Sequence, residues 1–336
     1  MEHFNVFTQE DCNAYKTTRY NLDERLPVGL EEEPHSFKDH LEICNSWNEL
    51  QEIKAPYVII GIPEDLGVRA NMGRPGAHEA WDNFLTHFLN LQHSELNDAH
   101  RFCILGTVHV GDLITSCVQC DVTIHEQRAL LSDAIKVLDD RVTAVVDAII
   151  KAKKIPIIIG GGHNNCFPIL RSLGKESPID CINMDAHTDL RPAKGRHSGN
   201  GFTHAIEQGF LKKYFMIGIQ HAYLTNDMIK LINDSDDISY VPYTVGAFDD
   251  AEHINRALSH VDSTNYGLEI DMDVVAHFPS SAQSPVGYSL EQLRSLVKNL
   301  LKESTPKYIH ICEAAPRYGT THEVGKALAN LVNDFK

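Results

Sequence analysis

The sequence predicts an α/β fold in three layers, a mostly parallel sheet with helices on both faces. Short apolar runs typical of buried strands alternate along the chain with longer segments whose apolar residues recur at helical spacing. This alternation favours a parallel sheet, because each helix returns the chain to the end at which the previous strand began. The chain has 336 residues, 43% of them hydrophobic, which is enough for one large core or two small ones. No shift in composition marks an internal boundary, so we expect a single domain over residues 55–336 behind an N-terminal extension of residues 1–54.

The N-terminal extension is polar and acidic, with the run EEEP at Glu31–Pro34. It is expected to be an arm or capping segment that packs on the body of the protein or on a neighbouring subunit. The first clear strand is Tyr57–Ile62, and the glycines and proline after it indicate a long loop before a helix near Ala77. Within this loop we expect Arg69 and Arg74 to brace the backbone through hydrogen bonds to carbonyl groups.

The elements that follow continue the alternation. Glu126–Lys154 is expected to form one long amphipathic helix, and strand Ile155–Ile159 follows it directly. The other expected strands are Phe102–Leu105, Ile179–Met184, Tyr214–Ile219, Ile238–Val241, Tyr266–Ile270 and Lys307–Cys312. The other expected helices lie near His204–Lys213, Asn226–Asn233, Ala251–Val261, Ser289–Lys302 and Thr321–Phe335.

Three residues with metal-ligand chemistry follow strand Ile179–Met184 within five positions: Asp185, His187 and Asp189. Two carboxylates and an imidazole this close together at a strand exit can face a common point, and once buried they require a cation. Oxygen and nitrogen ligands without a thiolate suit Mn²⁺ or a similar divalent ion better than a structural zinc site. The alternative is a solvated acidic turn.

Two further segments strengthen the metal-site hypothesis. In IPIIIGGGHNN a strand and three glycines precede His163, and in GLEIDMDVV Asp271 and Asp273 stand two positions apart. Side chains alternate along a strand, so we expect the two aspartates to share one face. Alone, the glycine run could be only a tight turn and the aspartates only an exposed pair. Together the segments supply six candidate ligands at strand ends.

The motifs GGGH, DAHTD and EIDMD occur here in the order in which the ureohydrolase family, the arginases and agmatinases, carries them. The chain resembles this family from about Tyr57 to the C-terminus. The resemblance implies an arginase-like fold, two Mn²⁺ ions per subunit and assembly into a homo-oligomer, a trimer or hexamer. The metal ligands that it implies are His163, Asp185, His187, Asp189, Asp271 and Asp273.

Charge counting indicates the kind of substrate. The four aspartates offset the charge of two divalent cations, and a hydroxide between the cations would leave the site slightly negative, which favours an amidinium or guanidinium group beside it. Paired divalent cations activate water at neutral pH, so the hypothesis is attack of that water on the planar C–N carbon. Asp189 would be both a ligand and the base that orients the water. Glu313, in HICEAAP, stands where the family has a glutamate that pairs with the cationic nitrogens; the alternative is a strand-end residue that caps a loop.

Differences from arginases bear on the substrate. The chain resembles arginases through Ser198–Gly199–Asn200, but Phe202 replaces their proton-shuttle histidine and Arg191 replaces an asparagine. The loop GVRANMGRPGA instead resembles formimidoylglutamases. Guanidinium groups suit carboxylate capture, and N-formimidoyl-glutamate carries two carboxylates and one amidine. The expected substrate-binding residues are Arg191, Arg196, Ser198 and Asn200, although Arg196 could instead be a surface charge.

The leading hypothesis is therefore a binuclear manganese hydrolase that converts N-formimidoyl-L-glutamate to glutamate and formamide in histidine degradation. A guanidino hydrolase of the arginase or agmatinase type, which releases urea, remains an alternative. A single-metal deacetylase of the same fold would lack the pair His163 and Asp189. A non-catalytic homologue would typically have lost ligands.

The composition argues against nucleic acid and membranes as partners and leaves small molecules as the expected ones. The net charge of −16 argues against nucleic acid or an anionic membrane as the main partner. No apolar run approaches the roughly 20 residues that span a bilayer. The eight cysteines are scattered, and the C-x-x-C at Cys117 and Cys120 lacks a second pair for a zinc site. With no signal-peptide pattern at the N-terminus, we expect a cytoplasmic protein.

Overall fold

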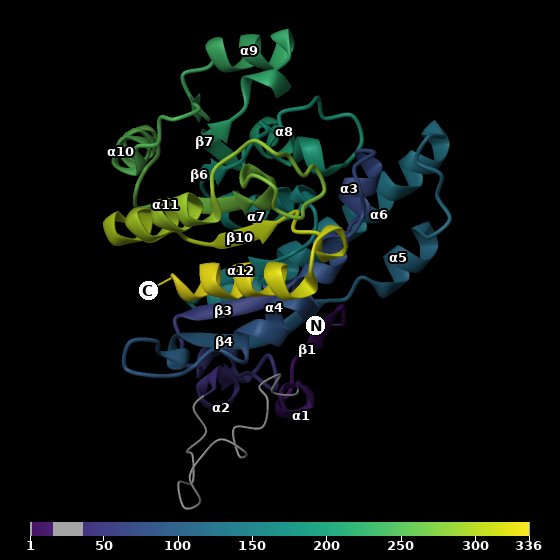
Figure 1. Ribbon diagram of the computed structural model, residues 1–336. Helices are drawn as coiled ribbons and strands as arrows, with labels where there is room; N and C mark the ends of the chain where they lie inside the picture. The colour runs from purple at the N-terminus through teal and green to yellow at the C-terminus, as the bar shows by residue number, and fades with distance from the viewer. Residues whose placement is uncertain (1, 16–35, 336) are drawn as a thin grey trace, which may run out of the picture.

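The computed structural model describes residues 2–15 and 36–335 (Figure 1). Within them, a ten-stranded sheet is covered by helices on both faces, which confirms the predicted three-layer α/β fold. The acidic run Glu31–Pro34 lies outside the described residues. In the described part of the chain, no helix combines the length and apolar character needed to cross a bilayer.

The elements alternate much as predicted. The strands are β1 (Phe4–Val6), β2 (Glu42–Ile43), β3 (Tyr57–Gly61), β4 (Phe102–Val108), β5 (Ile155–Ile159), β6 (Ile179–Met184), β7 (Leu211–Ile219), β8 (Ile238–Pro242), β9 (Tyr266–Asp271) and β10 (Ile309–Cys312). The α-helices are α1 (Gln9–Ala14), α2 (Phe37–His40), α3 (Leu66–Ala70), α4 (Ala80–Phe88), α5 (Gly111–Cys117), α6 (His125–Lys151), α7 (Cys166–Gly174), α8 (Gly201–Glu207), α9 (Asn226–Asn233), α10 (Asp250–His260), α11 (Leu290–Glu303) and α12 (Thr321–Asn333).

The sheet runs in the order β1-β4-β3-β5-β10-β9-β6-β7-β8, with β2 also pairing with β4. Among the described strands every pairing is parallel except that of β1 with β4. The register places one row of apolar residues across the middle of the sheet: Ile59, Ile157, Ile309, Leu268 and Ile182. At one end of the strands, the carboxyl ends of five neighbours therefore lie next to one another: β3, β5, β10, β9 and β6.

Each face of the sheet carries its own core. In β5, Ile157 and Ile159 pack in the core under α4, α11 and α12, whereas Ile158 packs in the core under α6 and α7. Side chains alternate across a strand, so a continuous apolar run is buried only when helices cover both faces. Figure 1 shows α12 and α4 side by side over one face, and the two helices are in contact.

The described part of the N-terminal segment lies on the body of its own chain. β1 pairs with β4 through Phe4–Val108, Asn5–Thr107 and Val6–Gly106, and the Phe4 ring packs edge-on against Trp47 at 4.8 Å between centroids. β2 also joins β4. These contacts cover β4, which would otherwise be the edge strand of the sheet and would expose unpaired backbone groups. The division at residue 54 stays a prediction.

The boundary between α8 and β7 differs clearly from the prediction. Helix α8 ends at Glu207 and β7 begins at Leu211, whereas the sequence placed the helix as far as Lys213 and the strand from Tyr214. Gly209 adopts a φ of 75° just after the helix, and the amide of Phe210 donates to the Ala205 carbonyl. This left-handed glycine closes the helix and frees the next residues for the strand.

Candidate metal centre

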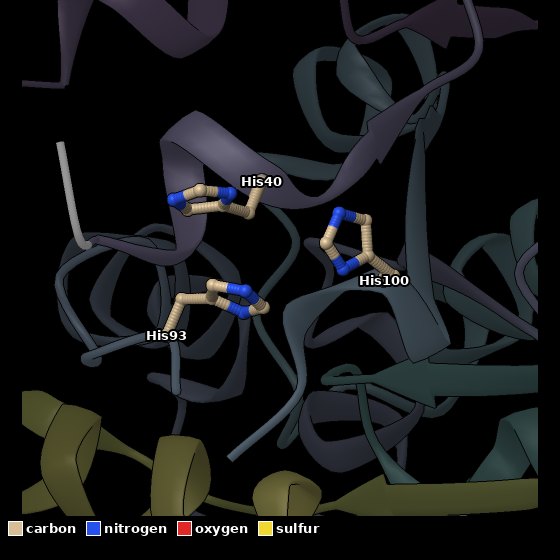
Figure 2. A group of neighbouring side chains, drawn as sticks. All are labelled: His40, His93 and His100. Atoms are coloured by element: carbon tan, nitrogen blue, oxygen red, sulfur yellow. The ribbon is translucent and has the colours of Figure 1, made fainter. Parts of the chain in front are cut away.

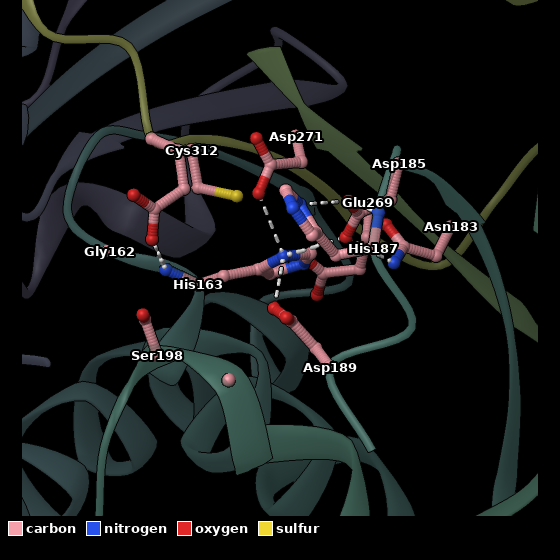
Figure 3. Close-up of polar contacts among 12 residues, drawn as sticks. Gly162, His163, Asn183, Asp185, His187, Asp189, Ser198, Glu269, Asp271 and Cys312 are labelled. Atoms are coloured by element: carbon pink, nitrogen blue, oxygen red, sulfur yellow. Dashed lines mark hydrogen bonds and ion pairs between the residues drawn. The ribbon is translucent and has the colours of Figure 1, made fainter. Parts of the chain in front are cut away.

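The six predicted ligands come together at the carboxyl ends of three strands in the middle of the sheet. Figure 3 labels His163, Asp185, His187, Asp189 and Asp271. His163 follows β5, the segment Asp185–Asp189 follows β6, and Asp271 and Asp273 end β9 or follow it. The outer ends of parallel strands are where open α/β sheets place their ligand sites.

The glycine run before His163 makes a sharp turn. Gly160 and Gly161 have φ values of 85° and 75°, and a Cβ on Gly161 would lie 2.4 Å from Nδ2 of Asn165. The buried carboxylate of Glu64 holds this turn by accepting from the amide of Gly162 at 3.1 Å and from Nδ2 of Asn165 at 2.6 Å. The turn directs the His163 side chain back over the strand ends.

Nδ1 of His163 is the centre of the first ligand group. It lies 3.3 Å from Oδ2 of Asp185, 3.0 Å from Oδ2 of Asp189 and 3.2 Å from Oδ2 of Asp271. The His163 ring is fully buried, and none of these three carboxylates is more than 14% exposed.

The second ligand group contains Asp185, His187 and Asp273. Nδ1 of His187 lies 2.9 Å from Oδ2 of Asp273 and 3.7 Å from Oδ1 of Asp185. Asp185 is fixed between the groups, because Oδ1 accepts the His187 amide at 2.6 Å and Oδ2 accepts Nδ2 of Asn183 at 3.0 Å. The two groups thus share one carboxylate.

The route by which Asp273 reaches the cluster differs from the expectation. The two aspartates were expected on one face of a strand, but β9 ends at Asp271 and Met272–Val274 is a turn of 3₁₀ helix. The Asp273 amide donates to Oδ1 of Asp271 at 2.8 Å and closes this turn. The strand argument was therefore wrong for Asp273, although both carboxylates face the cluster.

The electrostatics of the cluster fit a bound cation. Burial, with the neighbouring charges of Asp273 and Asp185, raises the pKa of Asp271 well above its usual value, and burial also raises the pKa of Asp189. Within the described residues, Nδ1 of His163 and Oδ1 of Asp273 have no hydrogen-bond partner. Buried polar atoms without partners are costly, and cations placed among them would satisfy both the lone pairs and the charge.

A second layer of buried polar groups orients His163, and the sequence analysis missed it. Nε2 of His163 faces Oε2 of Glu269 at 3.4 Å, an ion-pair distance at which no hydrogen bond is formed among the described residues. Glu269 in turn accepts from the hydroxyl of Tyr308 at 2.8 Å and lies 2.6 Å from Nδ1 of His310. A carboxylate at Nε2 leaves Nδ1 free to act as a ligand. The sequence did contain a signal for this layer, because Glu269 and His310 are polar residues inside the otherwise apolar strands β9 and β10.

Glu313 follows β10 and lies beside the cluster. Its Oε1 accepts the His163 amide at 2.7 Å, and Oε2 has no hydrogen-bond partner among the described residues. Burial raises the pKa of Glu313 to about 7. Its side chain lines a cavity of about 320 Å³ together with His187, Asp189, Asp271 and Asp273.

Two of the four predicted substrate-binding residues line the same cavity. Arg191 is exposed there and donates from Nη1 to Oδ1 of Asn71 at 3.0 Å, and Ser198 accepts from Nδ2 of Asn71 at 3.2 Å. Tyr223 stacks on the His187 ring with 4.6 Å between centroids.

The structure gives Arg196 and Asn200 a different role. Arg196 is 3% exposed; it donates from Nε and Nη2 to the Asp139 carboxylate at 2.9 and 3.0 Å and from Nη2 to the Asn164 carbonyl at 2.9 Å. Asn200 is fully buried and donates to the carbonyls of Pro192 and Gly195. Neither residue lines this cavity, although Arg196 lines the neighbouring one, so we assign both to bracing the ligand loop, and their predicted contact with substrate stays a prediction.

The expected bracing by Arg69 and Arg74 is confirmed. Arg69 donates to the Cys117 carbonyl at 2.6 Å, and Arg74 donates to the carbonyls of Ser280 and Ser281 at 2.8 and 3.2 Å. The second contact holds the loop after β9 at the cavity, which Ser281 lines.

The sequence profile of the arginase family matches residues 55–335. The chain belongs to the arginase family. It is 25% identical over 297 residues to a formimidoylglutamase of Macrococcus caseolyticus (strain JCSC5402), covering 87% of this chain and 88% of the relative. It is 27% identical over 292 residues to a formimidoylglutamase of Geobacillus thermodenitrificans (strain NG80-2), covering 83% and 82%.

Solved structures agree on the arginase fold. The crystal structure of Trypanosoma cruzi formiminoglutamase with Mn²⁺ superimposes with a TM-score of 0.67 at 20% identity, covering 90% of this chain and 97% of that one. The chain is accordingly a hydrolase of the arginase family, and its own cavity must indicate the substrate.

Proposed function

We propose that this arginase-family chain is a binuclear manganese hydrolase that converts N-formimidoyl-L-glutamate and water to L-glutamate and formamide. The observation that carries the proposal is a pair of ligand groups sharing Asp185, beside a cavity with Glu313 at one side and Arg191 at another. The formimidoylglutamases among its relatives support the choice of substrate.

The residues present fit two divalent cations. His163, Asp185, Asp189 and Asp271 would hold one ion, and Asp185, His187 and Asp273 would hold the other. This oxygen-rich set favours Mn²⁺, and the structural relative from Trypanosoma cruzi contains Mn²⁺. When bound, such a pair supplies a water molecule of lowered pKa as the nucleophile.

The side chains of the cavity suggest how the amidine is oriented. Oε2 of Glu313 lacks a partner, so it can accept N–H groups of a cationic amidine, while the His163 amide holds Oε1 in place. Asp189 faces the same cavity and would accept a proton from the attacking water. The oxygen of the water bonds to the amidine carbon and becomes the carbonyl oxygen of formamide. The bond from that carbon to the glutamate nitrogen breaks, and both protons of the water pass to that nitrogen, which leaves as the ammonium group of glutamate.

The charge around the cavity favours a substrate with carboxylates. Arg191 lines both the metal-side cavity and a neighbouring cavity of about 480 Å³, which Arg128, Lys194 and the ion pair of Lys136 with Asp133 also line. A guanidinium can hold a carboxylate through two parallel hydrogen bonds. This cationic surrounding suits the two carboxylates of N-formimidoyl-glutamate better than the ammonium-bearing tail of arginine.

The decisive experiment is a substrate panel with manganese-loaded protein in which formamide, ammonia and urea are measured separately. We expect formamide from N-formimidoyl-glutamate. Urea released from arginine or agmatine, without formamide, would replace this proposal with the guanidino-hydrolase alternative. Homo-oligomer assembly and a cytoplasmic location stay predictions.

A further inference from the structure

Three histidines gather far from the metal centre, at the opposite end of the sheet (Figure 2). His40 ends α2, His93 lies in the loop after α4, and His100 lies in the turn Ala99–Arg101 that leads into the amino end of β4. The metal centre lies at the carboxyl ends of the strands. The three rings are therefore independent of the catalytic machinery.

The three rings lie next to one another, as Figure 2 shows. The rings of His40 and His93 stack with 4.1 Å between centroids, and His100 lies edge-on to His93 at 4.9 Å. One nitrogen from each ring lies within 4.8 Å of the nitrogens of the other two. The lone pairs of two stacked rings point in parallel, so binding one ion would require His40 or His93 to turn out of the stack.

The backbone that carries these histidines is already fixed. The amides of Phe37 and Lys38 donate to the carbonyls of Leu91 and Leu89 at 2.8 and 3.1 Å, which ties α2 to the loop after α4. The buried Phe37 ring packs edge-on against Phe88 at 5.2 Å. In the same loop, two backbone hydrogen bonds of 3.0 and 2.9 Å between Ser94 and Asn97 close a tight turn next to His93. A ligand would thus meet a preformed scaffold, which reduces the ordering cost of binding.

Neighbouring groups determine which nitrogens can bind. Nδ1 of His100 lies 2.9 Å from Oδ1 of Asp98, an arrangement that places the ring proton on Nδ1 and leaves Nε2 as the ligand. Nδ1 of His93 accepts the Ala99 amide at 3.1 Å, and an ion bound through that nitrogen would replace the amide.

We propose that His40, His93 and His100 bind one divalent transition-metal ion, such as Zn²⁺, with water completing the coordination. Neutral imidazoles suit Zn²⁺, Ni²⁺ or Cu²⁺, whereas oxygen ligands suit Mn²⁺. The site therefore differs in selectivity from the oxygen-rich centre. A bound ion would fasten α2, part of the predicted N-terminal extension, to the body of the protein.

The test is a zinc titration of the full-length, manganese-loaded protein, with zinc and manganese measured per chain. We expect the wild type to take up one more zinc than His93→Gln or His100→Gln, at micromolar free zinc. The matched control is His3→Gln, which removes an exposed histidine from the same N-terminal segment and should leave zinc uptake unchanged. Asp98→Asn should weaken the site about 10- to 100-fold, because the histidine loses its orienting partner.

Equal zinc uptake by the wild type and the two ligand variants would overturn the proposal, as would uptake only at millimolar zinc. Zinc that displaces manganese at the catalytic centre does so in every variant and is seen as manganese loss, so it cancels in the comparison. Anomalous scattering from zinc-soaked crystals gives a second readout, a peak between the three rings. Hydrolysis of N-formimidoyl-glutamate is measured separately, so failure of the catalytic proposal leaves this result unaffected.

Discussion

Two of the side chains at the metal centre stand on unusual backbone. Asp189 and Glu313 have φ values of 50° and 63°, in the left-handed region that non-glycine residues seldom adopt. Such conformations persist where the surrounding structure holds them, and they are often found at functional sites. Both residues carry carboxylates that line the cavity. At these positions the chain carries a carboxylate side chain although the backbone conformation would favour glycine.

Glu313→Gln tests the proposed contact with the amidine. The amide oxygen of glutamine can still accept the His163 amide, so we expect an unchanged fold and manganese content. Loss of the negative charge should lower kcat/KM about 100-fold. Steady-state kinetics and metal analysis check this, and an unaltered kcat/KM would exclude Glu313 from substrate binding.

Glu269→Gln tests the layer that orients His163. We expect a loss of about 10- to 100-fold in manganese affinity, because His163 loses the carboxylate that faces Nε2. Manganese titration of the metal-free protein measures the effect. Tyr308→Phe removes one hydrogen bond to Glu269 and should have a smaller effect. Equal affinities in wild type and Glu269→Gln would assign this network to packing alone.

Arg191→Met tests the proposed capture of a carboxylate. Arg191 is exposed in the cavity, so its removal should leave the free energy of unfolding within about 0.5 kcal/mol of the wild type. KM for N-formimidoyl-glutamate should rise at least about tenfold, because a charged hydrogen bond contributes roughly 1.5–3 kcal/mol. An unchanged KM in this variant would show that the carboxylates of the substrate do not bind Arg191.

Sequence reasoning could place the six metal-ligand candidates because each is polar and ends or follows an apolar strand. It could not separate Arg191 from Arg196, since both are arginines in one polar loop. The distinction depends on Asp139, far earlier in the chain on α6, which pairs with Arg196 in the folded protein. Glu64 was missed for the same reason, because its partners lie in the glycine turn after another strand.

At the scale of elements, the ligand loop after β6 is fastened to α6 through this buried ion pair. The side chains of Arg196 and Asp139 are each 3% exposed. The guanidinium carbon of Arg196 also lies 4.6 Å from the centroid of the Phe167 ring. A loop that carries three of the candidate metal ligands is thus held by the longest described helix of the protein.

Arg196→Gln should destabilise the protein by about 3–5 kcal/mol, because Asp139 would remain buried without its cation. The double variant Arg196→Gln with Asp139→Asn should recover part of that loss. Denaturant unfolding measures both. A loss below about 1 kcal/mol in the single variant would contradict the bracing role.

Some elements were hard to predict for local reasons. Helix α7 begins within the segment that follows the glycine turn, so its apolar residues merge with the metal motif rather than forming a separate pattern. The turn Met272–Val274 continues the apolar alternation of β9, and the strand ends through two hydrogen bonds, from the Asp273 amide to the Asp271 side chain and from the Val275 amide to the Met272 carbonyl.

At the scale of the whole molecule, the alternation of strands and helices was sufficient to predict the layered fold. The order of strands was not predictable, because β10 lies between β5 and β9 although more than a hundred residues separate it from β5 in the chain. That insertion brings Glu313 beside His163, so the last strand completes the site.

Removal of metal should lower the stability of the entire domain. The clustered aspartates repel one another when no cation is bound, so protein treated with a chelator should unfold at a lower temperature than manganese-loaded protein. Manganese at 100 times its dissociation constant should restore about 2.7 kcal/mol, and the unfolding temperature should rise with manganese concentration. Calorimetry tests this; a melting temperature independent of manganese would mean that the cluster binds no ion.

The carboxylate common to both ligand groups has a consequence for how the protein is loaded. Asp185 contributes to each group and is held there by the His187 amide and by Asn183, so both positions present a formed set of ligands at the same time. We therefore expect the two positions to fill together, with few chains holding a single ion at equilibrium. Where manganese is scarce, most molecules would hold either two ions or none. Activity would then decrease steeply as the manganese concentration falls.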